Sequence, residues 1–142
     1  MCVDYQHKVT HDKAKAIRLV KLRFSRMILY FGGVIAVAET WNMPAHDKRK
    51  RLAELLSFPT TGRIKSVIGN EANEAINAYA TFLEALNDQA TRDKLEDADL
   101  NLATSKEFQK LRCLAQNFRA ELRRLLEDRY PENHPIHMSL IF

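Results

Sequence analysis

The sequence predicts an all-α, single-domain helical bundle with long N-terminal and C-terminal helices packed along heptad-like seams. Glycine and proline number only four each, and most of them fall between the apolar periodic segments, as helical chains require. Apolar residues recur at spacings of three and four near both ends of the chain, which is the period of an amphipathic helix. A chain of 142 residues buries enough surface for one core. We therefore expect one domain over 1–142, with an arm at 1–10 and a tail at 130–142.

The first predicted helix runs from about residue 11 to residue 41, because Thr10 and Asp12 suit a helix start. Its seam alternates steps of three and four residues through Ile17, Val20, Phe24, Met27, Phe31, Val34, Ala38 and Trp41. Each glycine of the Gly32–Gly33 pair costs about 1 kcal/mol relative to alanine, which predicts a close backbone approach or a bend. A second apolar set faces the opposite side and predicts an interface inside the bundle or with another copy: Leu19, Leu22, Leu29, Tyr30 and Val37.

Short elements are predicted between the two long helices. They are a helix at 45–57, a turn at 60–62, one or two helical turns at 63–68, a helix from Asn70 to about Leu86, and an acidic helix from Thr91. Pro59 and Gly69 set helix boundaries in this region, since proline limits a helix and glycine commonly ends one.

The last long helix has the clearest local signals. Thr104 and Glu107 have the spacing of a capping box. They are followed by an apolar seam of Phe108, Leu111, Ala115, Phe118, Leu122 and Leu125. We expect this helix to end at about Arg129, because Pro131 follows. The apolar end of the tail is expected to dock on the body or on a neighbour.

Charge is distributed unevenly along the chain. Residues 1–65 hold thirteen Lys or Arg against five Asp or Glu, whereas residues 66–104 hold two against eight. This predicts one basic face and one acidic face, the latter including segment 88–99. Cys2 and Cys113 fit no disulfide framework, and the first residues lack the apolar core of a secretory signal, which favours the cytoplasm. The uncharged run from Met27 to Ala38 is too short to span a membrane.

Basic side chains are the strongest functional signal. Six of them lie between Asp12 and Glu39 without an intervening acid, and like charges one turn apart repel until anions approach. The alternative interpretation is a set of solvated faces. The predicted contacts to a nucleic-acid backbone are Lys13, Lys15, Arg18, Lys21, Arg23, Arg26, Lys48, Arg49, Lys50, Arg51, Arg112, Arg119 and Arg123, with Gln116 beside the last three.

Catalytic motifs are weak, so a non-enzymatic protein without cofactor or metal is expected. There is no GxSxG, no HExxH and no glycine-rich phosphate loop. The segment Arg129-Tyr-Pro-Glu-Asn-His134 resembles the Arg, four to six residues, His signature of HEPN ribonucleases. That resemblance implies a dimeric RNase using Arg129 and His134. Pro131 and Pro135 depart from the family pattern, and we expect them to keep this Arg and His from sharing a helix face.

The sequence thus predicts a binding protein that engages a nucleic-acid backbone, or an acidic protein surface, through basic helix faces. In size, helicity and charge it resembles the small helical subunits of ribonucleoprotein effector complexes, and either a homo-oligomer or a larger complex fits this interpretation. The main rival is an oligomerising scaffold or inhibitor that uses the second apolar face. The HEPN-like ribonuclease is the third hypothesis.

Overall fold

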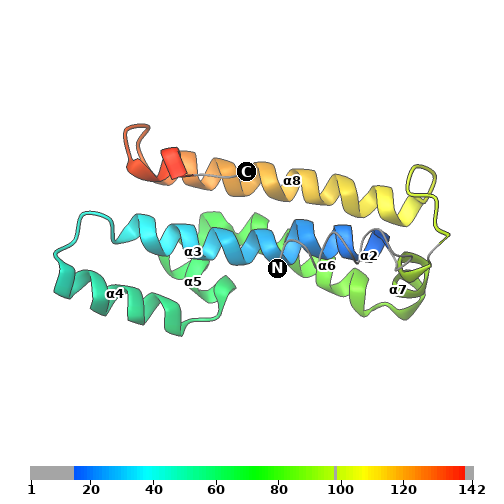
Figure 1. The fold of residues 1–142 in the computed structure, drawn as a ribbon, viewed down its shortest axis with the longest axis horizontal. Coiled ribbons are helices and arrows are strands. Elements are labelled where there is room, and N and C mark those ends of the chain that lie inside the picture. Colours follow the sequence, from blue (N-terminus) through cyan, green and yellow to red (C-terminus); the bar gives the residue numbers. More distant parts are fainter. Residues whose placement is uncertain (1–14, 98, 140–142) are drawn as a thin grey trace.

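The computed structural model describes residues 15–97 and 99–139, and within these residues all regular structure is helical (Figure 1). The all-α class is therefore confirmed. The elements in chain order are α2 (Lys15–Lys21), a π-helical segment (Leu22–Arg26), α3 (Met27–Glu39), α4 (Ala45–Ser57), α5 (Thr60–Ile68), a 3₁₀ segment (Gly69–Ala72), α6 (Asn73–Asn87), α7 (Gln89–Glu96), α8 (Lys106–Arg129) and a second 3₁₀ segment (Pro135–Ser139). Helices α2 and α3 follow one line, and α8 runs beside them (Figure 1).

The first helix, which consists of α2, the π segment and α3, departs from the predicted seam in its second half. The seam is buried as far as Phe24, but Met27 and Val34 are only half-buried. After the π segment the buried apolar seam continues through Ile28, Phe31, Ile35 and Ala38, and Gly32 and Ala36 beside it are buried as well. A π turn takes up more residues than an α turn, so the step after Phe24 is four residues where three were predicted. The helix ends at Glu39, and Trp41 is exposed, so the prediction that Trp41 belongs to the seam is wrong.

Three stacked phenylalanine rings from three helices form the centre of the core. The ring of Phe24 lies 4.4 Å from that of Phe82 in α6 and 5.3 Å from that of Phe118 in α8, between centroids. Each such pair contributes about 0.5–1.5 kcal/mol beyond the burial of its area. The seam predicted for α8 is buried at every position: Phe108, Leu111, Ala115, Phe118, Leu122 and Leu125. The two long helices therefore pack along this seam, with α6 against α8.

A glycine allows α5 to pack closely on α3. A Cβ atom built at Gly32 would lie 2.6 Å from Cγ2 of Thr60, whereas one built at Gly33 would meet nothing within 4 Å. The predicted close backbone approach is thus confirmed at Gly32. Gly33 has no such neighbour in the described chain.

Helix α5 begins earlier than the sequence indicated. Residues 60–62 form its first turn, so the predicted turn there is wrong. Pro59, at the N-cap with ψ 150°, directs the chain into the helix at once, and Gly69, with φ 81°, ends it as predicted. Arg63 ties the helix to the end of α4, because its Nε donates a hydrogen bond to the carbonyl of Leu55 at 2.8 Å.

Three predicted helix starts are displaced along the chain. The helix predicted from Asn70 begins at Asn73, because Asn70 lies in the 3₁₀ segment that precedes α6. Asp88, not Thr91, caps α7, and its carboxylate accepts the backbone N–H of Thr91 at 2.9 Å. Ser105, not Thr104, caps α8, and its hydroxyl accepts the backbone N–H three residues further on at 3.3 Å. Glu107 forms an ion pair with α7. The capping-box prediction was therefore wrong, although the helix itself was placed correctly.

The C-terminal part of the chain turns back after α8. The helix ends at Arg129, as predicted, and Ile136 of the last 3₁₀ segment is buried against the body. The predicted docking of the tail's apolar end falls on residues 140–142, which lie outside the described residues, as do the arm at 1–10 and the helix start near residue 11.

Candidate nucleic-acid interface

A groove of about 210 Å³ lies between the first helix and α8, and three of the predicted cations line it. Its lining residues are Arg23, Met27, Arg112, Ala115, Gln116 and Arg119, and we call it the arginine groove. Ala115 and Met27 supply apolar surface, whereas the three guanidinium groups and the Gln116 amide supply hydrogen-bond donors. The groove therefore brings together cations that are far apart in the sequence.

Helix geometry places these side chains. Arg112, Gln116 and Arg119 are spaced by four and three residues on α8, which aligns them on one side of the helix. That side lies next to the buried seam, so the side chains flank the core rather than point directly away from it. Arg23 approaches from the π segment, one turn before Met27.

The arginines of the groove have no internal counter-charge in the described residues, where Arg23, Arg112 and Arg119 form no ion pair and no side-chain hydrogen bond. Local spacing explains this, because no Asp or Glu stands three or four residues away from any of them. Among the described residues, no carboxylate lines the groove either. These positive charges are therefore available to an external anion.

Other arginines of α8 are neutralised by their own helix. Arg123 Nε lies 2.8 Å from a carboxylate oxygen of Glu127, and Arg124 Nη2 lies 2.6 Å from one of Glu121. The pair with Glu121 raises the pKa of Arg124 above its ordinary value. Arg123, a predicted contact, thus lies outside the groove and carries a partner one turn away.

The remaining cations predicted in the first helix do not line the groove. Lys15 and Lys21 are exposed, Arg18 is half-buried, and Arg26 is exposed. Arg18 and Arg26 each take part in further interactions. Lys13 lies outside the described residues.

The basic cluster of α4 is separate from the arginine groove. Figure 1 shows α4 on the side of α3 away from α8. Lys48 Nζ donates a hydrogen bond to the carbonyl of Trp41 at 3.0 Å, and Arg51 pairs with Glu54 at 2.9 Å. Arg49 and Lys50 are exposed. Sequence position alone therefore grouped cations that the fold separates.

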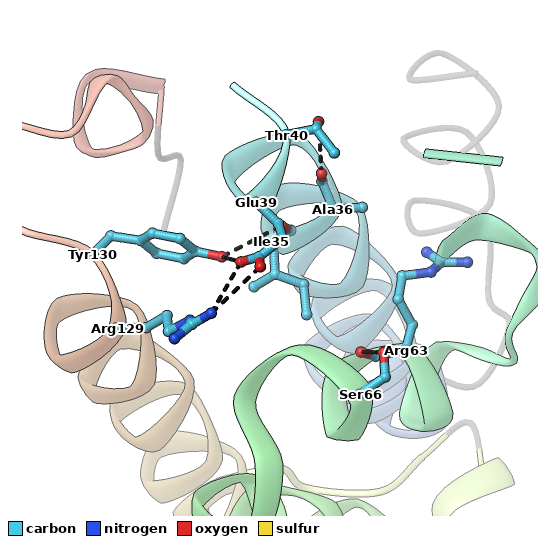
Figure 2. A network of polar contacts seen from close by, with 8 residues as sticks. All are labelled: Ile35, Ala36, Glu39, Thr40, Arg63, Ser66, Arg129 and Tyr130. Atoms are coloured by element: carbon cyan, nitrogen blue, oxygen red, sulfur yellow. Dashed lines mark hydrogen bonds and ion pairs between the residues drawn. The ribbon is translucent and has the colours of Figure 1, made fainter. Parts of the chain in front are cut away.

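A second recess, of about 350 Å³, lies where α3 ends beside the end of α8. Its lining residues are Ala38, Glu39, Trp41, Asn42, Met43, Arg129, Tyr130 and His134, and we call it the end recess. Figure 2 shows Arg129 and Tyr130 directed toward Glu39, with Arg129 Nη2 3.2 Å from a Glu39 oxygen. The Tyr130 hydroxyl lies 3.4 Å from the Ile35 carbonyl. Burial, and then the nearby Glu39 carboxylate, raise the pKa of Tyr130 to about 12.

His134 is the unusual member of the end recess. Its side chain is only 7% exposed, and its Nε2 has no hydrogen-bond partner within the described structure. Its Nδ1 accepts the backbone N–H of Ile136 at 3.1 Å. The Trp41 ring meets the imidazole edge to face, with centroids 5.2 Å apart. This contact joins residues 93 positions apart, so no local sequence signal could have identified the recess.

The two residues of the HEPN-like segment both line the end recess. Arg129 belongs to α8 and His134 to the turn beyond it, so the prolines do separate them from a common helix, as expected. The turn nevertheless returns His134 to the same recess, with Arg129 engaged by Glu39. The ribonuclease hypothesis itself stays a prediction.

The predicted protein interface divides into two parts. Leu19, Leu22 and Tyr30 are half-buried, and Tyr30 takes part in further interactions. Leu29 and Val37 are 60% and 57% exposed. These two exposed residues and the half-buried Gly33 between them, at intervals of four, form a strip on α3, which we call the α3 strip.

A third cavity, of about 370 Å³, lies between α6, α7 and α8 and contains no residue predicted to bind a ligand. Across residues 15–97 and 99–139, no group of three or more His, Cys, Asp or Glu side chains is arranged to hold a metal ion. In the same part of the chain, no helix combines the length and apolar character needed to span a bilayer. Comparison with protein-family models, curated proteins and solved structures finds no match.

Proposed function

We propose that this protein binds nucleic acid through the phosphate backbone, with the arginine groove as the main contact surface. The observation that supports this function most strongly is the convergence of Arg23, Arg112 and Arg119, none of which has a carboxylate partner within residues 15–97 and 99–139. Arginine presents a planar fork of donors that matches phosphate oxygens, and it is less strongly hydrated than lysine. A phosphate in the groove would contact two helices at once.

The dimensions of the groove suit a short stretch of backbone. Arg112 and Arg119 are seven residues apart on a straight helix, which corresponds to about 10 Å at 1.5 Å per residue. That distance covers about three nucleotides at the 3.4 Å rise of one strand. Gln116 lies between them and supplies a neutral donor. Sequence-independent binding is expected, because the proposed contacts of the three arginines are to phosphate oxygens, which carry no sequence information.

Fluorescence anisotropy of labelled random oligonucleotides, titrated with salt, tests the proposal. We expect affinity to fall steeply between about 50 and 200 mM salt. In Arg112→Gln/Arg119→Gln the log–log salt slope for a single strand should become less negative by about 1.4, because two phosphate contacts are lost. The absence of binding at the lowest salt concentration would refute the proposal.

A matched control comes from the same helix. Arg123→Gln/Arg124→Gln removes the same number of positive charges, but both arginines already pair with carboxylates. We expect this variant to keep most of the wild-type salt slope. Equal changes of the salt slope in the two double variants would show that binding depends only on net charge. The groove would then have no special role.

Self-association is the second candidate function, and it is favoured by the α3 strip. Leu29 and Val37 expose apolar surface, and Gly33 between them would let another helix approach closely. We expect a light-scattering mass above the 16.4 kDa of one chain, reduced toward that value by Leu29→Lys/Val37→Lys. Leu22 is a poorer target because it is half-buried. A monomer at high protein concentration would exclude this function.

A further inference from the structure

We infer that the end recess receives one base of a single-stranded nucleic acid whose phosphates occupy the arginine groove. This inference rests on the proposed function and adds the strand type and a base-docking site to it. Three aromatic residues that line the recess support this inference: Trp41, Tyr130 and His134.

His134 supplies an unsatisfied hydrogen-bond donor. Its Nδ1 accepts the Ile136 N–H, so in the neutral imidazole the proton is on Nε2. This Nε2–H is buried and has no acceptor in the described structure, an arrangement that is unfavourable until an acceptor reaches it. An acceptor atom brought by a ligand would satisfy it. Trp41 packs edge to face with the imidazole and is itself exposed, so an incoming group that contacts the indole lies beside His134.

The recess favours a flat, neutral group over a second phosphate. Arg129 and Glu39 neutralise one another across it. Trp41 is 49% exposed and offers an indole face, and Asn42 adds an amide with both donor and acceptor atoms. A nucleobase combines a π face for stacking with ring nitrogens and carbonyl oxygens that accept hydrogen bonds. Its chemistry therefore matches what the recess offers.

Helical periodicity places the end recess in line with the arginine groove. Arg119 lies on α8 eleven residues before Tyr130, which caps the end of that helix, and eleven residues are close to three full turns. Met27 of the groove and Ala38 of the recess are eleven residues apart within α3, which is also close to three full turns. The two sites thus lie along one side of the junction between the helices, which run next to each other in Figure 1.

Their axial separation is about 16 Å, from eleven residues at 1.5 Å each. A few nucleotides of an extended strand span this distance. A paired base could not enter the recess without leaving its duplex, whereas an unpaired base is free to rotate into it. The recess therefore selects a single strand, whereas the groove alone would accept either form.

Trp41 is the sole tryptophan of the chain, so intrinsic fluorescence reports on the recess directly. The probes are a thymidine 15-mer and an abasic 15-mer of equal length and charge, each also followed by anisotropy through an end label. We expect the thymidine strand to quench Trp41 and to bind about fivefold or more tightly than the abasic strand. The abasic strand should bind through the groove and leave the fluorescence unchanged.

Two variants separate stacking from folding. Trp41→Ala should reduce thymidine-strand affinity about fivefold or more, to the level of the abasic strand. Trp41→Phe keeps an aromatic face and should stay within about twofold of wild type. Circular dichroism checks that both variants are folded.

The outcomes distinguish the two proposals. If both strands bind equally and Trp41 fluorescence does not change, the base-docking inference is wrong while the groove stands. If the abasic strand quenches Trp41 as strongly as the thymidine strand, a phosphate occupies the recess and the inference is also wrong. If neither strand binds at low salt, the proposed function fails, and the inference fails with it.

Discussion

Two adjacent glycines of α3 provide a sharp test of the packing between α3 and α5. Gly32 faces α5, where an added Cβ would lie 2.6 Å from Thr60 Cγ2, whereas an added Cβ at Gly33 meets nothing within 4 Å. Both positions are in the interior of one helix. Substitution by alanine therefore has the same intrinsic effect on helix propensity at both, and only the tertiary contact differs.

The expected magnitudes follow from this contrast. Gly33→Ala should raise the free energy of unfolding by about 0.5–1 kcal/mol, the cost of glycine within a helix. At Gly32 the same gain is offset by overpacking, which costs about 1–3 kcal/mol. Gly32→Ala should therefore be neutral or destabilising by up to about 2 kcal/mol. The two variants should differ by at least about 1 kcal/mol.

Urea unfolding followed by circular dichroism measures this difference, with Thr60→Ser as the coupling partner. Serine lacks the Cγ2 atom that the new Cβ would strike, so Gly32→Ala/Thr60→Ser should recover much of the loss. A double-mutant cycle should give a coupling energy of at least about 0.5 kcal/mol. If Gly32→Ala stabilises the protein as much as Gly33→Ala does, the close approach of α5 is incorrect.

Three further predictions concern a helix cap, the titration of a tyrosine and the hydrogen bonds of Arg63. Ser105 caps α8, so Ser105→Ala should lower the free energy of unfolding by about 1 kcal/mol relative to wild type. Thr104→Ala should lower it by less than about 0.5 kcal/mol, and urea unfolding measures both values. Tyr130 has a pKa of about 12 in the folded protein, above its unfolded value, so ionisation of its hydroxyl favours unfolding as the pH rises. Between pH ~10 and pH ~12 the wild type should therefore lose up to about 2 kcal/mol more of its free energy of unfolding than Tyr130→Phe does. Identical pH profiles of stability would contradict this. Arg63→Lys should lower the melting temperature by about 3–5 °C, since lysine cannot reproduce the fork of hydrogen bonds to α4, and an unchanged melting temperature would count against those bonds.

The last helix was predictable because its signals are local. Six apolar residues at steps of three and four define its buried face, and every one of them is buried. The cap was misplaced by one residue, since Thr104 and Ser105 are both good acceptors and the choice depends on the backbone of the preceding loop. Glu107 was assigned to the cap, but Lys94 of α7 attracts it instead. Periodicity thus predicts the face of a helix, whereas tertiary contacts decide its ends.

The arginine groove was only partly predictable. The sequence placed Arg112 and Arg119 beside the apolar seam, and the lack of a nearby acid at spacings of three or four indicates that they remain unpaired. The same rule assigns Arg123 to Glu127. What the sequence could not show is that Arg23, almost ninety residues earlier, lines the same groove. Whether Arg23 reaches the groove depends on how the first helix and α8 are aligned along their lengths, and no local sequence pattern encodes that alignment.

The π segment connects the core to the groove. Met27 and Ile28 are both apolar, so a count of spacings cannot decide which of them continues the seam. The fold decides it at Phe24, whose ring is fixed between Phe82 and Phe118. Because the π turn takes up an extra residue, Ile28 enters the core and Met27 moves to the edge, where it lines the groove one turn after Arg23. The interruption of the predicted seam therefore shapes the surface on which the proposed function depends.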